Sequence, residues 1–248
     1  MVLAPSSSGE RYNLMLTVAL CKGKLIEPTL KLFAKAGYDA VKPAADSRRL
    51  LIPCPEIGMA FLIVRPTDVP TYVEHGAADV GVVGKDVLLE QDRDVYEPLD
   101  LGFGACRIAV AAFRGQAARD RLSSKIRVAT KYPKITERYF NQRGVPVEII
   151  KLYGSIELAP IVGLADRIVD LVETGSTLKA HGLVEIECIA RSTARLIVNR
   201  ASLKLKHQAI GELLKNLRLA CAASERSSRA GSAKPIRTAG RKEKRART

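Results

Sequence analysis

A chain of 248 residues of which 47% are hydrophobic can form one large packed domain or two lobes of ordinary size. The net charge of +14 is uneven, because residues 224–248 hold nine Lys or Arg against two Glu, and with 5% aromatic residues to stack on bases a nucleic-acid partner is not favoured. No apolar run approaches the ~20 residues of a membrane span, and residues 1–12 read as a disordered lead-in without a signal peptide's apolar core, so we expect a cytoplasmic protein without a membrane partner.

Strands and helices alternate from residue 14 onward. Residues 14–20 form a continuous apolar run, which is typical of a strand buried on both faces, and a tight basic turn follows over residues 22–24. Apolar side chains at i, i+4 and i+7 then predict a helix that starts at Ile26 and ends at Gly37.

The same alternation continues as far as Leu99. Asp68 is expected to cap a helix that starts at Val69, and residues 84–86 are expected to open another. Further strands are predicted over residues 38–42, 59–64 and 80–83. A repeated strand–helix order is the pattern of a parallel α/β sheet.

The residues Gly102-Phe103-Gly104 are expected to be a hinge, after which the alternation resumes. Helices are predicted over 135–144 and 206–219, and strands over 107–112, 127–129, 147–152, 168–172, 183–189 and 194–198. Two α/β lobes with a cleft between them account for this order better than one long sheet. We expect lobe I over residues 13–101, completed by 191–220, lobe II over 102–190, and a basic disordered tail over 221–248.

The most informative stretch lies in the second half of the chain. Asp170 interrupts the apolar strand 168–172, where an unpaired carboxylate would be costly, and Thr174-Gly175-Ser176-Thr177 follow just before a helix expected from about Leu178. Backbone N–H groups and hydroxyls at a helix N-terminus can hold a phosphate, and a carboxylate just ahead of them suits sugar hydroxyls. The layout favours a site for a sugar 5′-phosphate, although a polar loop with a helix cap remains the alternative.

Other common sites are excluded by the spacing of their residues. The five cysteines include no C-x-x-C pair, and the three histidines are far apart, so neither a zinc site nor a disulfide framework is expected and no protein metal site is predicted. No G-x-S-x-G elbow is present, which removes the commonest hydrolase signature.

Several blocks of the chain resemble the ATP phosphoribosyltransferase family in its short form. The blocks are ALCKGKL (19–25), DSRRL (46–50), RPTDVPTYVEHGAADVGVVGKDVLLE (65–90), DLGFGACRIAVA (100–111), VATKYPKI (128–135) and KLYGSIELAPIVGLADRIVDLVETGSTLKAHGLVE (151–185). The resemblance implies a two-lobed α/β fold like that of type II periplasmic binding proteins. It also implies transfer of the phosphoribosyl group of phosphoribosyl pyrophosphate to N1 of ATP, with inversion, loss of pyrophosphate and a need for Mg²⁺ carried by the substrate.

The resemblance further implies roles for individual residues. Pyrophosphate stabilisation falls to Arg48 and to Lys24 of the K-G-K turn, where we expect an arginine in the short form, and lysine lacks the planar fork of arginine. The ribose and the 5′-phosphate fall to Asp170, Glu173, Thr174, Gly175, Ser176 and Thr177. The remaining substrate contacts are implied for Lys22, Gly23, Asp46, Arg49 and Asp86, of which Asp46 and Asp86 would face ATP.

Partners are also implied by the resemblance alone. Short-form subunits are expected to form homo-oligomers and to work with a regulatory subunit similar to histidyl-tRNA synthetase. Two rival functions remain beside the transferase. A solute-binding protein of this fold class would have no reason to carry D-L-V-E-T-G-S-T, and a nucleotide-salvage phosphoribosyltransferase would carry a second acid where this chain has Val169.

Overall fold

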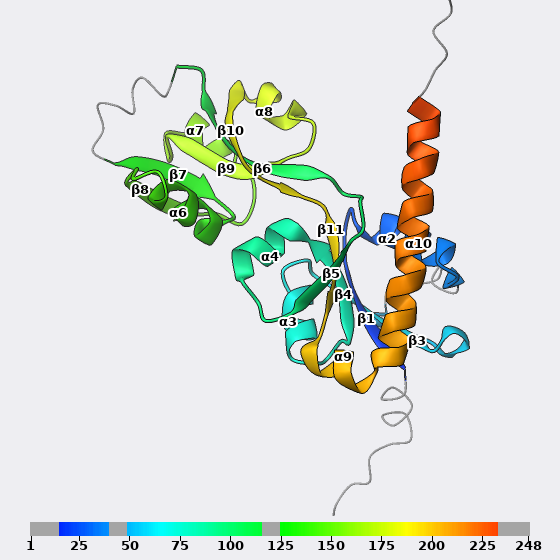
Figure 1. Ribbon diagram of the computed structural model, residues 1–248. Helices are drawn as coiled ribbons and strands as arrows, with labels where there is room; N and C mark the ends of the chain where they lie inside the picture. The colour runs from blue at the N-terminus through cyan, green and yellow to red at the C-terminus, as the bar shows by residue number, and fades with distance from the viewer. Residues whose placement is uncertain (1–14, 40–48, 116–124, 233–248) are drawn as a thin grey trace, which may run out of the picture.

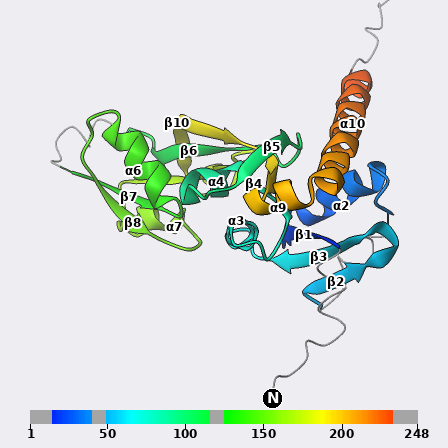
Figure 2. The same cartoon turned by 60° about the horizontal axis from the view of Figure 1, so that its bottom comes forward.

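Two mixed β-sheets with helices packed against them form the two lobes of this chain in a computed structural model (Figure 1). The structure describes residues 15–39, 49–115 and 125–232. Figure 2 shows the same lobes turned by 60°, with α10 running along one side of lobe I. No helix of this described part is long and apolar enough to cross a membrane.

Lobe I is built on a six-stranded sheet in the order β2-β3-β1-β4-β11-β5. In its centre β1, β3 and β4 run parallel, and helices cover both faces, so Val18 packs with Phe33 and Phe61 while Ala19 packs with Val69 on the other side. The elements are β1 Leu16–Cys21, α2 Ile26–Lys35, β2 Leu51–Cys54, η2 Pro55–Ile57, β3 Met59–Val64, α3 Val69–Glu74, β4 Val80–Gly84, α4 Lys85–Gln91, β5 Tyr96–Asp100, β11 Ala194–Val198, α9 Arg200–Leu205 and α10 His207–Ser232.

Lobe II is built on a five-stranded sheet in the order β10-β6-β9-β7-β8. One face packs Ile168 and Leu183 against α7 and α8, and the other packs Val110 and Val169 against Phe140 of α6. The elements are β6 Cys106–Phe113, β7 Ile126–Thr130, α6 Pro133–Asn141, β8 Val147–Lys151, α7 Leu158–Ile161, β9 Arg167–Val172, α8 Ser176–Ala180 and β10 Leu183–Ser192.

The two-lobed α/β fold is confirmed, but the expectation of parallel sheets is wrong in part of each lobe. β2, β5 and β11 pair antiparallel in lobe I, and β6 pairs antiparallel with β9 and β10 in lobe II. β2 and β5 lie at the edges of the sheet and contain Pro53 and Pro98, and a proline within a short run argues against a strand. β6 and β11 enter their sheets from the connections between the lobes and therefore need no covering helix to return the chain.

The chain crosses between the lobes twice, and the two crossings are hydrogen bonded to each other. The N–H of Leu101 donates to the carbonyl of Ala194, and the N–H of Ala194 donates to the carbonyl of Phe103, both at 2.9 Å. Gly104 has φ +66°, a conformation that favours glycine, and a Cβ there would lie 2.4 Å from Leu25 Cδ2 and force that side chain to shift. The predicted hinge is therefore one half of a paired connection.

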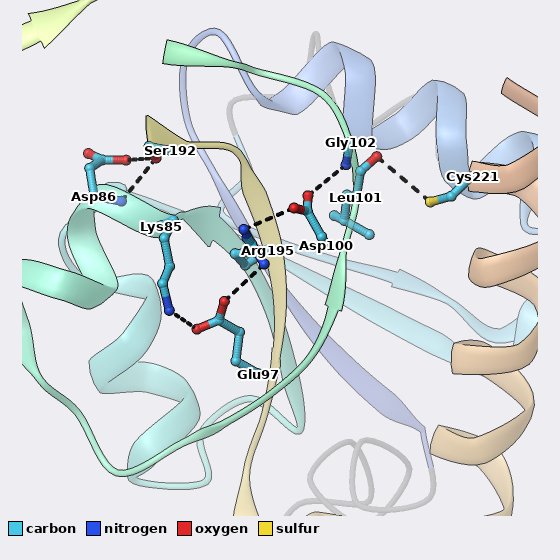
Figure 3. Close-up of polar contacts among 9 residues, drawn as sticks. All are labelled: Lys85, Asp86, Glu97, Asp100, Leu101, Gly102, Ser192, Arg195 and Cys221. Atoms are coloured by element: carbon cyan, nitrogen blue, oxygen red, sulfur yellow. Dashed lines mark hydrogen bonds and ion pairs between the residues drawn. The ribbon is translucent and has the colours of Figure 1, made fainter. Parts of the chain in front are cut away.

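Charged side chains brace this connection on the side of lobe I, as Figure 3 shows. Arg195 of β11 contacts Glu97 at 3.3 Å and Asp100 at 2.9 Å, and Lys85 contacts the same Glu97. Asp100 also accepts the N–H of Gly102 at 2.9 Å. The start of α4, the strands β5 and β11 and the first crossing are thus joined by one polar network.

Three local predictions need correction. Residues 221–232, expected to be part of a disordered tail, belong to α10, which continues to Ser232. The helix is nucleated where Ile210, Leu213 and Leu217 are buried at helical spacing, and its extension then adds one hydrogen bond per residue at little cost. The expected cap residue Asp68 makes no capping bond to α3. Tyr38 and Asp39 are not in a strand, and residues 40–42 of that prediction lie outside the described residues.

Candidate active site

A cleft of about 1340 Å³ lies between the lobes, where the carboxyl ends of several strands meet. Lobe I contributes the turn after β1 and the start of α4, and lobe II contributes the end of β9, the loop before α8 and the segment after β7. The cleft is lined by most of the predicted site residues, namely Lys22, Lys24, Asp86, Asp170, Glu173, Thr174, Gly175, Ser176 and Thr177. Residues more than 140 positions apart in the sequence are thereby brought to one surface.

The predicted phosphate loop is a short polar turn that leads into α8. Gly175 is the N-cap with φ +80°, and α8 begins at Ser176, two residues earlier than the sequence analysis expects. The Thr174 side chain accepts the N–H of Ser176 at 3.3 Å and its hydroxyl lies 3.0 Å from the Ser176 hydroxyl. The first turn of a helix has N–H groups without intrahelical acceptors, so the loop offers both hydroxyl and backbone donors to an anion.

Arg107 of β6 holds the chain that leads into this loop. Its guanidinium donates to the carbonyl of Glu173 at 3.1 Å and binds both carboxylate oxygens of Glu185, the shortest contact being 2.6 Å. A planar guanidinium with two such partners has a fixed orientation. The loop is therefore anchored from the neighbouring strands rather than by its own side chains alone.

Asp170 lies near the end of β9 and faces the cleft. Burial raises the pKa of its carboxyl, the bond from the Leu171 N–H at 2.8 Å opposes this, and the negative charge of Glu157 raises the pKa further while Lys131 lowers it. Asp170 is thus a half-buried carboxylate that accepts a local hydrogen bond from the next residue. Its remaining lone pairs can accept the hydroxyls of a sugar.

The K-G-K turn brings a cation of lobe I to the phosphate loop of lobe II. Gly23 has φ +115° and lets the chain turn sharply after β1, so that Lys22 and Lys24 line the cleft. The Nζ of Lys24 lies 2.8 Å from Glu173 Oε2, and this bond raises the pKa of the Lys24 ammonium. Lys24 is therefore charged and close to the loop, while its side chain stays exposed.

Asp86 is buried at the base of the cleft and is bound from both sides. Ser192 Oγ donates to one oxygen at 2.9 Å, and the Asp86 N–H donates back to Ser192 (Figure 3). Tyr132 Oη donates to the other oxygen at 3.0 Å. Burial, followed by the charge of Asp86, raises the pKa of the Tyr132 phenol, so this group remains a donor. Each of the two oxygens has a second lone pair, so a contact between Asp86 and ATP would be made beside these hydroxyls and stays a prediction.

Several residues of the cleft are missed by the sequence analysis. Lys131 and Tyr132 follow β7, Ser192 ends β10, and Glu157 begins the turn of α7. Lys131 and Tyr132 could have been found, because they follow a predicted strand at its carboxyl end. Ser192 and Glu157 carry no local signal, since only the pairing of distant strands brings them to the cleft.

Three predicted residues belong to the segment before β2. Asp46 and Arg48 lie outside the described residues. Arg49 is exposed at the start of the next described segment and is not among the described residues that line the cleft. Their proposed contacts therefore stay predictions.

Comparison with known proteins agrees with this geometry. The family model described as ATP phosphoribosyltransferase matches residues 65–219. The ATP phosphoribosyltransferase of Syntrophotalea carbinolica is 60% identical over 205 residues, which cover 82% of this chain and 93% of that protein.

Solved structures give the same result at lower identity. The ATP phosphoribosyl transferase (HisG:HisZ) complex from Thermotoga maritima matches with a TM-score of 0.74 and 35% identity over 84% of this chain and all of that chain. The periplasmic aliphatic sulphonate binding protein SsuA from Escherichia coli matches with a TM-score of 0.56 and 13% identity over 88% and 76% of the two chains, which shows the shared fold alone. On the strength of the family match and of the identity to its relatives, the chain belongs to the ATP phosphoribosyltransferase family.

Proposed function

We infer that the chain catalyses the first step of histidine biosynthesis, the transfer of the phosphoribosyl group of phosphoribosyl pyrophosphate to N1 of ATP. The products are N1-(5-phosphoribosyl)-ATP and pyrophosphate, as in the family to which it belongs. The C1–O bond breaks with its electron pair on pyrophosphate while N1 of ATP bonds to C1 from the opposite face. Such a reaction needs positioning and control of charge rather than a covalent nucleophile.

The observation that carries this proposal at residue level is the arrangement along one wall of the cleft. Asp170 lies four residues before Thr174. These two residues line the cavity, as do Gly175, Ser176 and Thr177, which follow them. We propose that Asp170 accepts the ribose hydroxyls and that the loop donates to the 5′-phosphate. Glu173 lies between them at the edge of the loop.

We propose that Lys24 stabilises the leaving pyrophosphate together with Arg48. In support, the Lys24 ammonium reaches Glu173, the residue that precedes the phosphate loop. Pyrophosphate carries more negative charge than one carboxylate, so it can replace Glu173 as the partner of the Lys24 ammonium. Lys22 and Arg49 would add positive charge nearby, and Asp46 would face ATP.

The cleft also suits a magnesium ion that arrives with the substrate. Asp170 and Glu157 both line the cavity, and the charge of Glu157 contributes to the raised pKa of Asp170. Two neighbouring carboxylates are the oxygen donors that Mg²⁺ prefers, and the ion would neutralise both them and the pyrophosphate charge. Substrate oxygens would complete the coordination of the ion.

We further propose a regulatory partner of the kind present in the Thermotoga maritima HisG:HisZ complex. Such a hetero-oligomer, together with self-association of this chain, would act in the cytoplasm, where ATP and phosphoribosyl pyrophosphate are made. Mass photometry of the purified chain, alone and mixed with a HisZ protein, measures both associations. A monomer that never binds HisZ would contradict this part of the proposal.

The test of the reaction is an assay with ATP, phosphoribosyl pyrophosphate and Mg²⁺, read by the absorbance of the product. We expect turnover by the chain alone and a change of rate when a HisZ protein is added. The Asp170→Asn variant serves as the matched control with reduced activity. A chain that binds either substrate without turnover under all these conditions would instead be a solute-binding protein of the same fold.

A further inference from the structure

Helix α4 is connected to lobe I but packs against both lobes. Val87 and Leu88 are buried in a core cluster of lobe I, whereas the next residue, Leu89, packs against the lobe II cluster that contains Tyr132 and Ile135. Figures 1 and 2 both show α4 between the sheet of lobe I and α6. The helix is therefore the place where the two cores touch.

The face of α4 that meets lobe II carries two carboxylates. Leu89 and Glu90 follow Asp86 by three and four residues, so all three lie on the same side of the helix. Asp86 accepts the hydroxyl of Tyr132 at 3.0 Å. The two oxygens of Glu90 accept the N–H groups of Lys134 and Ile135, each at 3.0 Å.

Glu90 supplies a cap that α6 lacks. The N-cap position of α6 is Tyr132, which makes no side-chain capping bond, and Pro133 occupies the first helical position. Lys134 and Ile135 follow, and their N–H groups are those that the side chain of an N-cap Ser, Thr or Asp ordinarily satisfies. A carboxylate at this end of a helix is also favoured by the helix dipole. The capping bond of a helix is usually made by the residue that precedes it in the sequence, whereas in α6 it is made by a residue of the other lobe.

We propose that Glu90 is a positioning residue: by capping α6 from lobe I, it sets the distance between the lobes at which the cleft holds both substrates. The segment that it fixes begins with Lys131 and Tyr132, which line the cleft and follow directly from β7. The positive charge of Lys131 in turn lowers the pKa of Asp170, the proposed ribose contact. Loss of the cap should let the lobes separate and should leave the chemical groups themselves intact.

The first test is amide hydrogen exchange in the absence of substrates, which does not depend on the proposed reaction. In Glu90→Ala the amides of Lys134 and Ile135 should exchange roughly tenfold faster, since no other acceptor holds them in the first turn of α6. Glu90→Gln keeps one acceptor oxygen and should give an intermediate rate. The amides at the start of α3 should be unchanged in both variants.

The second test is steady-state kinetics of the same variants. If Glu90 sets the fraction of molecules in the binding-competent arrangement, KM for both substrates should rise by roughly five- to tenfold in Glu90→Ala, while saturating substrate restores kcat to within about twofold. Glu137→Ala, which removes an exposed acid from α6 outside the cleft, is the control and should behave as wild type.

A merely structural role predicts a different outcome. It would lower the melting temperature and the active fraction, and hence kcat, without moving KM. Unchanged exchange at Lys134 and Ile135, or an unchanged KM in Glu90→Ala, would overturn the proposal. Faster exchange with no turnover in any variant, wild type included, would contradict the proposed reaction and leave the capping contact standing.

Discussion

Burial raises the pKa of Asp170, because its surroundings in the cleft disfavour the charged form of the carboxyl. We expect Asp170→Asn to lower kcat/KM by about ten- to a hundredfold, because one charge-assisted bond to a sugar hydroxyl is worth roughly 1.5–3 kcal/mol. Steady-state kinetics with phosphoribosyl pyrophosphate as the varied substrate measures this loss. Activity close to that of the wild type would remove Asp170 from the site.

The same substitution has a pH-dependent effect on stability. A carboxyl whose folded pKa is raised destabilises the native state above that pKa, and the penalty disappears as the pH falls below its ordinary value of 3.8. Asp170→Asn should therefore be at least as stable as wild type near pH 7, and the two should converge at low pH. Urea denaturation at several pH values gives the comparison, and a variant less stable at pH 7 would show that Asp170 has a structural partner.

Lys24 provides a second test at the scale of one residue. If its ammonium meets the leaving pyrophosphate, Lys24→Ala should lower kcat, whereas Lys24→Arg should hold or raise it, because arginine offers two parallel donors to phosphate oxygens. Lys31→Ala is a matched control, since Lys31 also bonds an acid at 2.6 Å on the neighbouring helix but does not line the cleft. Full activity in Lys24→Ala would show that Lys24 does not contact the leaving pyrophosphate and that Arg48 stabilises it without Lys24.

At the scale of elements, the junction between β4 and α4 depends on a glycine. A Cβ on Gly84 would lie 2.2 Å from Asp86 Oδ1, so Gly84→Ala must push the Asp86 carboxylate away from Ser192 and Tyr132. We expect a loss of about 1–3 kcal/mol in the free energy of unfolding, from overpacking and from hydroxyls left without an acceptor. The loss can be measured by urea denaturation.

Gly211 of α10 is the matched control for this substitution. A Cβ there meets no atom within 4 Å, and Gly211→Ala in a helix should stabilise the protein by about 0.5–1 kcal/mol. If Gly84→Ala were as stable as wild type, the carboxylate of Asp86 would have another place to go and the contact with Tyr132 would not be needed for folding.

At the scale of the whole molecule, α10 extends beyond the body of lobe I in both Figure 1 and Figure 2. Near the end of the side chains that the structure describes, Ser224 Oγ accepts a bond from Lys35 Nζ of α2 at 3.2 Å. Truncation after Arg226 should therefore leave kcat/KM unchanged and the free energy of unfolding within ~0.5 kcal/mol. A truncated chain with impaired turnover would show that the basic segment takes part in catalysis or in the assembly that supports it.

Much of the architecture could be predicted because the signals are local. The buried strands β1, β3 and β4 are continuous apolar runs, and α2 shows helical spacing that ends at a glycine with positive φ. β2 and β5 escape prediction, since each is a short edge strand interrupted by a proline. The antiparallel direction of β6 and β11 depends on where the chain crosses between the lobes, which no local pattern encodes.

The sequence by itself determined the family and the two lobes, and it predicts a phosphate loop, because acid, glycine and hydroxyls lie within eight residues of one another. Only the tertiary structure decided which hydrogen-bond partner each charged side chain contacts. Asp86 was expected to face ATP, which stays a prediction, and the fold shows that it accepts bonds from Tyr132 and Ser192, which are 46 and 106 positions away. The cap that Glu90 places on α6 is likewise invisible in sequence, since a hydrogen bond between lobes depends on how two cores pack and not on spacing along the chain.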